Sequence, residues 1–254
     1  MPTSRMLRAA VSAGALAAGV AVMFSAARSA DKVPAGQFAP AAPAGVVLEK
    51  AKGMHRKAAV ELDNDPEYAA KMLWQLAEWV HVQEFRADKG LSAWAKKTST
   101  LYAEAAAAAV DDKAKAAAKT AAAGKAWADY EKNAKAWGDA KPAPGKHKRM
   151  SEDLDFIMAF HKEAAAQGTG TIDRAIRKGD LKPVHEDLLL LAEFGNMLVS
   201  DRADPKWKQY ASNLRHASLH MIEVGEKGDS VALKPALNEI QKACNDCHGG
   251  FRKK

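Results

Sequence analysis

The sequence predicts an all-α protein made of two tandem antiparallel four-helix bundles. The chain of 254 residues is rich in alanine and only 7% aromatic, a composition that disfavours a β fold. Apolar residues recur at helical spacing in two long segments, and short Gly- and Pro-containing breaks separate the runs. The length allows one large domain or two small ones, and the repeated helical pattern favours two bundles.

The first 27 residues have the pattern of a secretory signal peptide. Arg5 and Arg8 precede an apolar run from Ala9 to Phe24, and the small residues Ser25-Ala26-Ala27 follow it. A positive start, a short apolar core and small residues at the end are typical of a cleaved export signal. We therefore expect export to the periplasm and no membrane attachment of the mature chain. An uncleaved anchor helix is the alternative.

The remainder divides by composition into two linkers and two bundles. Pro, Ala and Gly dominate residues 28–45, which we expect to form a flexible linker. Residues 46–137 are predicted to form a helical bundle, and a Pro/Gly linker over 138–146 separates it from a second bundle over 147–254. Neither bundle contains a pattern typical of a strand or of a Gly-rich phosphate loop.

The second bundle contains four amphipathic runs joined by short loops. We expect the first run to end at Gly179, because glycine commonly terminates helices. Pro183 and Pro205 are predicted to open the second and third helices, and Gly225 to stop the third. The fourth helix is expected to become regular near Leu233. Short loops between consecutive helices favour an antiparallel four-helix bundle.

Charge and polar residues argue against nucleic-acid binding and against catalysis. Lys and Arg number 38 against 31 Asp and Glu, a formal net charge of +7, but the lysines are scattered and form no basic arm. No arrangement of Ser, Cys, His and Asp typical of nucleophilic catalysis can be identified, so we do not expect an enzyme. His216 and His220 have a spacing that can bind a metal, but no further ligand accompanies them, and we expect surface or partly buried histidines.

The two cysteines of the chain form the motif Cys244-Asn245-Asp246-Cys247-His248. Two thiols three residues apart lie on one helical turn, where they can add to the two vinyl groups of one haem, and the following imidazole can serve as proximal iron ligand. A thioredoxin-like redox pair would need a strand–turn–helix context, and a zinc site would need four ligands. The motif therefore predicts one covalent haem c.

An internal repeat relates the two bundles at an offset of 115 to 117 residues. We expect the first bundle to be a diverged copy without haem, in which aromatic side chains fill the volume that the porphyrin occupies in the second. Chance similarity between Ala-rich helices is the alternative. The matching segments are 76–79 with 191–194, 86–88 with 202–204, and Trp127, Tyr130 and Glu131 with Cys244, Cys247 and His248.

Residues 147–254 resemble a class II cytochrome c, the cytochrome c′ family. The resemblance rests on the haem motif close to the C-terminus, its continuation Gly249-Gly250-Phe251-Arg252, and the four helices before it. It implies a four-helix haem bundle that transfers single electrons to and from a partner protein whose identity is unknown. It also implies that Phe251 and Arg252 lie near the proximal side of the haem, and that the protein is a candidate homodimer.

In that family, the first helix supplies the residue at the sixth position of the iron. An apolar residue leaves the haem five-coordinate and able to bind NO or CO, whereas a Met gives a six-coordinate electron carrier. The family's spacing points to Met158 as the distal ligand here, and His161 is the competing candidate. Leu154 stands where the family has an Arg. The resemblance thus implies electron transfer, with NO or CO binding as the alternative.

Overall fold

The computed structural model describes residues 37–151, 158 and 170–251. These residues form helices and no strands beyond two isolated bridges, so the predicted all-α fold is confirmed. Within this part of the chain, no helix combines the length and the hydropathy needed to cross a membrane. The predicted signal peptide, the first part of the predicted linker and most of the helix expected after Ser151 lie outside the described residues.

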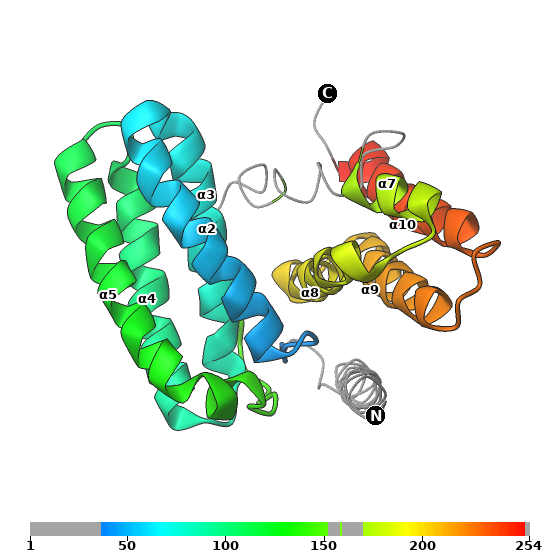
Figure 1. Cartoon of the computed structure of the whole chain (residues 1–254), viewed down its shortest axis with the longest axis horizontal. Coiled ribbons are helices and arrows are strands. Elements are labelled where there is room, and N and C mark those ends of the chain that lie inside the picture. The colour runs from blue at the N-terminus through cyan, green and yellow to red at the C-terminus, as the bar shows by residue number, and fades with distance from the viewer. Residues whose placement is uncertain (1–36, 152–157, 159–169, 252–254) are drawn as a thin grey trace, which may run out of the picture.

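The first half is a bundle of four helices (Figure 1). The connections between the helices are short, so consecutive helices run antiparallel, and α2 packs against α5 to close the bundle. A single 3₁₀ turn, η1 (Val82–Phe85), lies between the second and third helices. The helices are α2 (Ala44–Asn64), α3 (Pro66–His81), α4 (Lys89–Ala108) and α5 (Lys113–Gly138).

Aspartate side chains start three of these helices. Each carboxylate accepts a hydrogen bond from a backbone N–H of the first turn, which would otherwise lack a partner. This local signal fixes the helix starts. The capping residues are Asp65 for α3, Asp88 for α4 and Asp112 for α5, with N–H to oxygen distances of 3.0, 2.8 and 3.0 Å.

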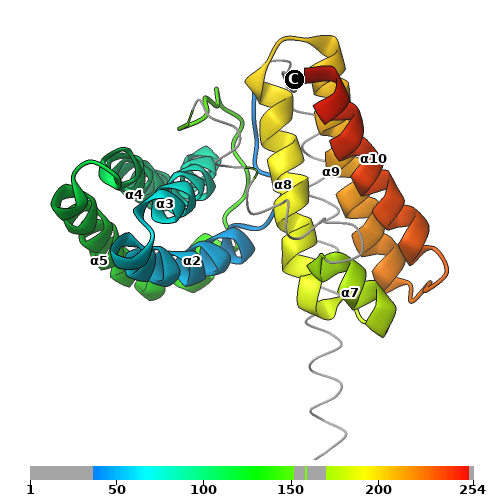
Figure 2. The same ribbon diagram turned by 90° about the horizontal axis from the view of Figure 1, so that it is seen from above.

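The second half contains α7 (Thr171–Lys178), α8 (His185–Asp201), α9 (Pro205–Glu226) and α10 (Leu233–Phe251). α8 packs along α9, α9 along α10, and the short α7 against α10 (Figure 2). Gly195 allows α8 and α9 to approach closely, because a Cβ there would lie 2.8 Å from the backbone nitrogen of Arg215. The pair therefore packs backbone to backbone at this point.

Most of the predicted helix boundaries in this half are confirmed. α7 ends at Gly179, whose φ of 69° is the left-handed conformation expected at a helix C-terminus. α9 begins at Pro205 and α10 at Leu233. The predicted start at Pro183 is wrong by two residues, because Pro183 lies in a 3₁₀ turn, η2 (Lys182–Val184), and α8 begins after it at His185. The predicted stop at Gly225 is wrong by one residue: α9 continues through it to Glu226, and the left-handed turn is made by Gly228, with φ of 70°.

Residues 37–43, which composition predicts to be part of a flexible linker, are packed between the two halves. The Phe38 side chain is 2% exposed, and the Phe38 and Gly145 backbones exchange two hydrogen bonds of 2.7 and 2.8 Å. The second predicted linker is also held, since the N–H of Ala143 donates to the carbonyl of Phe85 at 2.9 Å. Both segments find tertiary partners that their composition does not reveal.

A buried glutamate joins α8 to the segment before α2. Glu193 is 1% exposed, and its Oε2 accepts backbone hydrogen bonds from Ala41, at 2.7 Å, and Ala42. Asn196, one turn along α8, donates to the carbonyl of Ala39 at 2.8 Å. Burial raises the pKa of Glu193, and the backbone donors and the Arg86 guanidinium oppose this shift. The two halves are therefore connected through the interior and not only by the chain.

An aromatic cluster fills the centre of the first bundle. The rings of Trp94 and Trp127 lie 5.1 Å apart between centroids, and Trp127 and Tyr130 lie 5.5 Å apart. The Trp127 indole N–H donates to the Tyr102 hydroxyl at 2.7 Å. Trp127 and Tyr130, the counterparts of the two cysteines in the repeat, therefore point into the core. Glu131 is exposed and pairs with Lys52.

Replacing Trp127 with Ala should destabilise the first bundle by about 3–5 kcal/mol, because it leaves a cavity and strands the Tyr102 hydroxyl. Thermal unfolding followed by circular dichroism measures this loss. Tyr68→Ala is the matched control, since that ring is 39% exposed and its removal should change stability by less than about 1 kcal/mol. Equal melting temperatures for the two variants would contradict the role of Trp127.

Candidate functional site

The two cysteines continue the inward face of α10. The buried residues of this helix recur every three or four positions, and Cys244, Cys247 and Phe251 follow at the same spacing, partly buried against the same core. The helix therefore turns both thiols toward the bundle core, against which they are partly buried. The buried members of this face are Leu233, Ala236, Leu237, Ile240 and Ala243.

Both thiols are free and are held in the protonated form. Burial raises the pKa of Cys244 to about 11, and the nearby Cys247 adds to the shift. Burial also raises the pKa of Cys247, while the positive charge of Arg202 opposes that shift. The two sulfurs differ in surroundings, because Cys244 lies deeper and Cys247 lies closer to a cation.

His248 follows on the last turns of α10 and is partly exposed. Among the described residues, its imidazole has no hydrogen-bond or ion-pair partner. A histidine that folding leaves without such a partner keeps a ring nitrogen available to a metal. Cys244, Cys247 and His248 thus offer two thiols and one imidazole from a single helical segment.

Aromatic residues of α9 support the end of α10. The ring of Phe251 meets Trp207 edge to face at 5.2 Å and Tyr210 at 6.2 Å. The Arg202 guanidinium lies 4.2 Å from the Trp207 ring, a cation–π contact. The Trp207 indole N–H donates to the carbonyl of Leu198 at 2.7 Å, which fixes this ring against α8. The last turn of α10, with the motif, is therefore held in place by packing.

The structure describes only some of the remaining predicted site residues. Met158 is helical, partly buried and packed against the hydrophobic core, as a residue that points into the bundle would be. Phe251 lies on α10 next to the motif. His161 and Arg252 lie outside the described residues.

The two histidines spaced for metal binding have other partners. His220 pairs with Glu239 at 3.0 Å, and His216 is 2.9 Å from the guanidinium of Arg215. Within the described part of the chain, no group of three or more His, Cys, Asp and Glu side chains is arranged to hold a metal ion. Their expected place at the surface is confirmed, since both residues are exposed.

Sequence reasoning missed the support given by Arg202 and Trp207. Arg202 belongs to the repeated triplet Arg-Ala-Asp, whose first copy, Arg86, is buried and donates to the carbonyl of Ala42. The triplet marks the start of the third helix in each half, with Asp88 and Asp204 as caps. The repeat was the signal that could have drawn attention to Arg202.

The donor set fits a covalently attached haem. Two thiols on one face of a helix, directed at a bundle core, match attachment of a flat apolar group inside that bundle. The adjacent imidazole is a suitable iron ligand. The deep position of Cys244 and the packing around Phe251 would keep one side of such a group away from water.

The difference between the two thiols predicts their order of reaction in protein made without haem. At pH 8, iodoacetamide should alkylate Cys247 several-fold faster than Cys244, because Cys244 is more buried and its pKa is about 11. Peptide mass spectrometry over a time course measures both rates. Faster labelling of Cys244 would show that Cys244 is not the more buried of the two thiols.

Comparison with known proteins adds no assignment: the chain matches no family model, no curated protein and no solved structure.

Proposed function

We propose that the protein is an exported mono-haem c-type cytochrome that carries single electrons. Cys244 and Cys247 would hold the haem through thioether bonds, and His248 would be the proximal ligand of its iron. The observation that carries the proposal is the placement of both sulfurs on the inward face of α10, with the imidazole at the next position. The resemblance to the cytochrome c′ family points to the same activity.

The residues of the chain would position the haem and limit its exposure to solvent. When bound, the haem supplies an iron that changes between the ferric and ferrous states. Two covalent bonds from one helical turn fix the group relative to α10, and the buried face of that helix excludes water. Water stabilises the more highly charged oxidation state of a redox centre. A bundle core that excludes water would therefore tune the reduction potential of the haem.

Arg202 is the charged residue placed to influence this site. Its guanidinium is stacked on Trp207 and acts electrostatically on Cys247. A fixed positive charge nearby stabilises the ferrous haem, which carries one more electron than the ferric haem. We therefore expect Arg202 to raise the reduction potential of the haem.

One haem per chain follows from the contrast between the halves. The first bundle has no thiols, and Trp127 and Tyr130 occupy the places of the cysteines with their rings packed against Trp94. Side chains fill that core, so no room for a second porphyrin is expected there.

Coexpression with a cytochrome-maturation system tests the proposal. The purified chain should be coloured, keep its haem after denaturation, and lose the covalent link when both cysteines are replaced with Ala. His248→Ala should alter the visible spectrum, whereas His220→Ala, which changes an exposed histidine of α9, should not. A colourless wild-type protein with unmodified Cys244 and Cys247 would refute the function.

Met158→Ala tests the sixth position of the iron. If Met158 is the distal ligand, the reduced wild-type protein has sharp low-spin bands, and the variant becomes high-spin and binds CO. Met72→Ala is the control, because Met72 is a buried Met of α3 in the first bundle. A wild-type protein that is high-spin and binds CO or NO would instead favour gas binding as the function. A low-spin variant would point to His161.

A further inference from the structure

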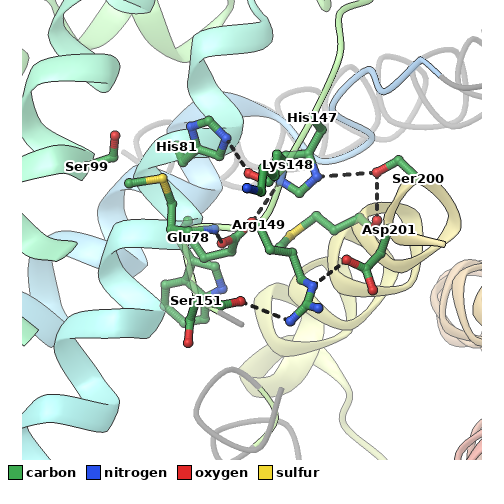
Figure 3. Close-up of polar contacts among 12 residues, drawn as sticks. Glu78, His81, Ser99, His147, Lys148, Arg149, Ser151, Ser200 and Asp201 are labelled. Atoms are coloured by element: carbon green, nitrogen blue, oxygen red, sulfur yellow. Dashed lines mark hydrogen bonds and ion pairs between the residues drawn. The ribbon is translucent and has the colours of Figure 1, made fainter. Parts of the chain in front are cut away.

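The segment 146–150, here named the strap, connects the two bundles and is fastened to both of them. Figure 3 shows it between Glu78 and His81 of α3 and Ser200 and Asp201 of α8. The side chains of His147 and Glu78 are both 0% exposed, although the strap has no regular secondary structure. A loop buried at this level needs specific partners for its polar groups.

Glu78 holds the strap at two points. Its Oε1 lies 2.7 Å from Nε2 of His147, and its Oε2 accepts the backbone N–H of Met150 at 2.7 Å. Both oxygens act as acceptors, which is the pattern of an ionised carboxylate. Nε2 of His147 must therefore carry a proton.

The other nitrogen of His147 also needs a proton. Nδ1 lies 3.3 Å from Oγ of Ser200, and that hydroxyl donates its single proton to the carbonyl of Met197 at 2.7 Å. Ser200 can then only accept from His147. All of these hydrogen bonds exist together only when both ring nitrogens of His147 are protonated.

His81 repeats this pattern on the same side of the strap. Its Nδ1 lies 2.8 Å from Oε1 of Glu84, and its Nε2 lies 3.1 Å from the carbonyl oxygen of Lys148. Neither oxygen carries a proton, so both ring nitrogens must donate. Burial lowers the pKa of His81, but the Glu84 hydrogen bond, the charges of Glu78 and Glu84 and the Lys148 carbonyl together raise it above 6.5.

The groups around the two rings balance their charge. The rings of His81 and His147 lie 5.2 Å apart, and Phe38 and Phe85 pack against them. Glu78 and Glu84 supply two negative charges, and Ser99 of α4 donates to Glu84 at 3.3 Å. On the α8 side, Arg149 of the strap pairs with Asp201.

We propose that the strap is a pH-operated fastening between the two bundles, closed while the rings of His81 and His147 donate all of these hydrogen bonds and released when His81 loses its proton. The inference is independent of the haem. A group with a raised folded-state pKa contributes stability that is complete below its unfolded value of 6.5 and is lost as pH rises through the folded value. The strap therefore opens as the pH rises through the folded-state pKa of His81, which lies above 6.5.

Hydrogen exchange of the full mature protein between pH 6 and pH 9.5 tests this fastening. After correction for the intrinsic rate of exchange, protection of the Met150 amide should fall at least about tenfold across this range, while amides in the centres of α4 and α5 stay protected. In His81→Gln, the Met150 amide should be about tenfold less protected already at pH 6, and the fall with pH should shrink. His220→Gln, which breaks an exposed His–Glu pair, should leave the curve unchanged.

Nitrogen NMR of the histidine rings gives a second readout that does not depend on the variants folding. At pH 6, both nitrogens of His81 should have the shifts of protonated imidazolium. A neutral His81 ring at that pH, or strap protection that does not change with pH in the wild type, would overturn the proposal. Glu84→Gln should lower the pH at which the strap opens, and an unchanged midpoint would also count against it.

Discussion

Two buried glutamates at equivalent places in the two halves hold the molecule together. Glu78 lies on the second helix of the first bundle, and Glu193 lies on the second helix of the other. Each accepts backbone hydrogen bonds from the segment that leads into the opposite half: Met150 for Glu78, and Ala41 and Ala42 for Glu193. Because a buried polar group without partners is costly, neither segment can leave its place without stranding a buried carboxyl group. The bundles depend on each other for their relative position.

The inward faces of α5 and α10 carry different kinds of residue. In the first bundle, the fourth helix contributes Trp127 and Tyr130, whose rings join Trp94 in a packed core. In the second bundle, the corresponding positions hold Cys244 and Cys247 on the inward face of α10. A core must be filled either by side chains or by a bound group, since empty volume destabilises the fold. This contrast is the physical basis for proposing one haem and for placing it in the second half.

Local signals made the helices predictable. Asp88 and Asp204 cap α4 and α9, and Pro205 and Gly179 mark a start and an end, because each acts through hydrogen bonds or backbone angles within a few residues. The error at Gly225 has a tertiary cause. A Cβ at that position would lie 2.5 Å from the end of the Leu181 side chain, so the glycine makes room for Leu181 inside the helix and does not end it.

The sequence by itself determined the all-α class, the helix boundaries at Gly179, Pro205 and Leu233, and the thiol and imidazole groups of the motif, since these depend on composition, spacing and near neighbours. Only the tertiary structure decided that residues 38–42 are buried, that the strap is fastened to both bundles, that Glu78 and Glu193 are the anchors of these segments, and that Arg202 and Trp207 lie beside the motif. The partners concerned are far apart along the chain, as with Ala41 and Glu193, which are separated by 152 positions. A Pro- and Ala-rich segment is flexible when isolated, and burial against a specific carboxylate is what orders it here.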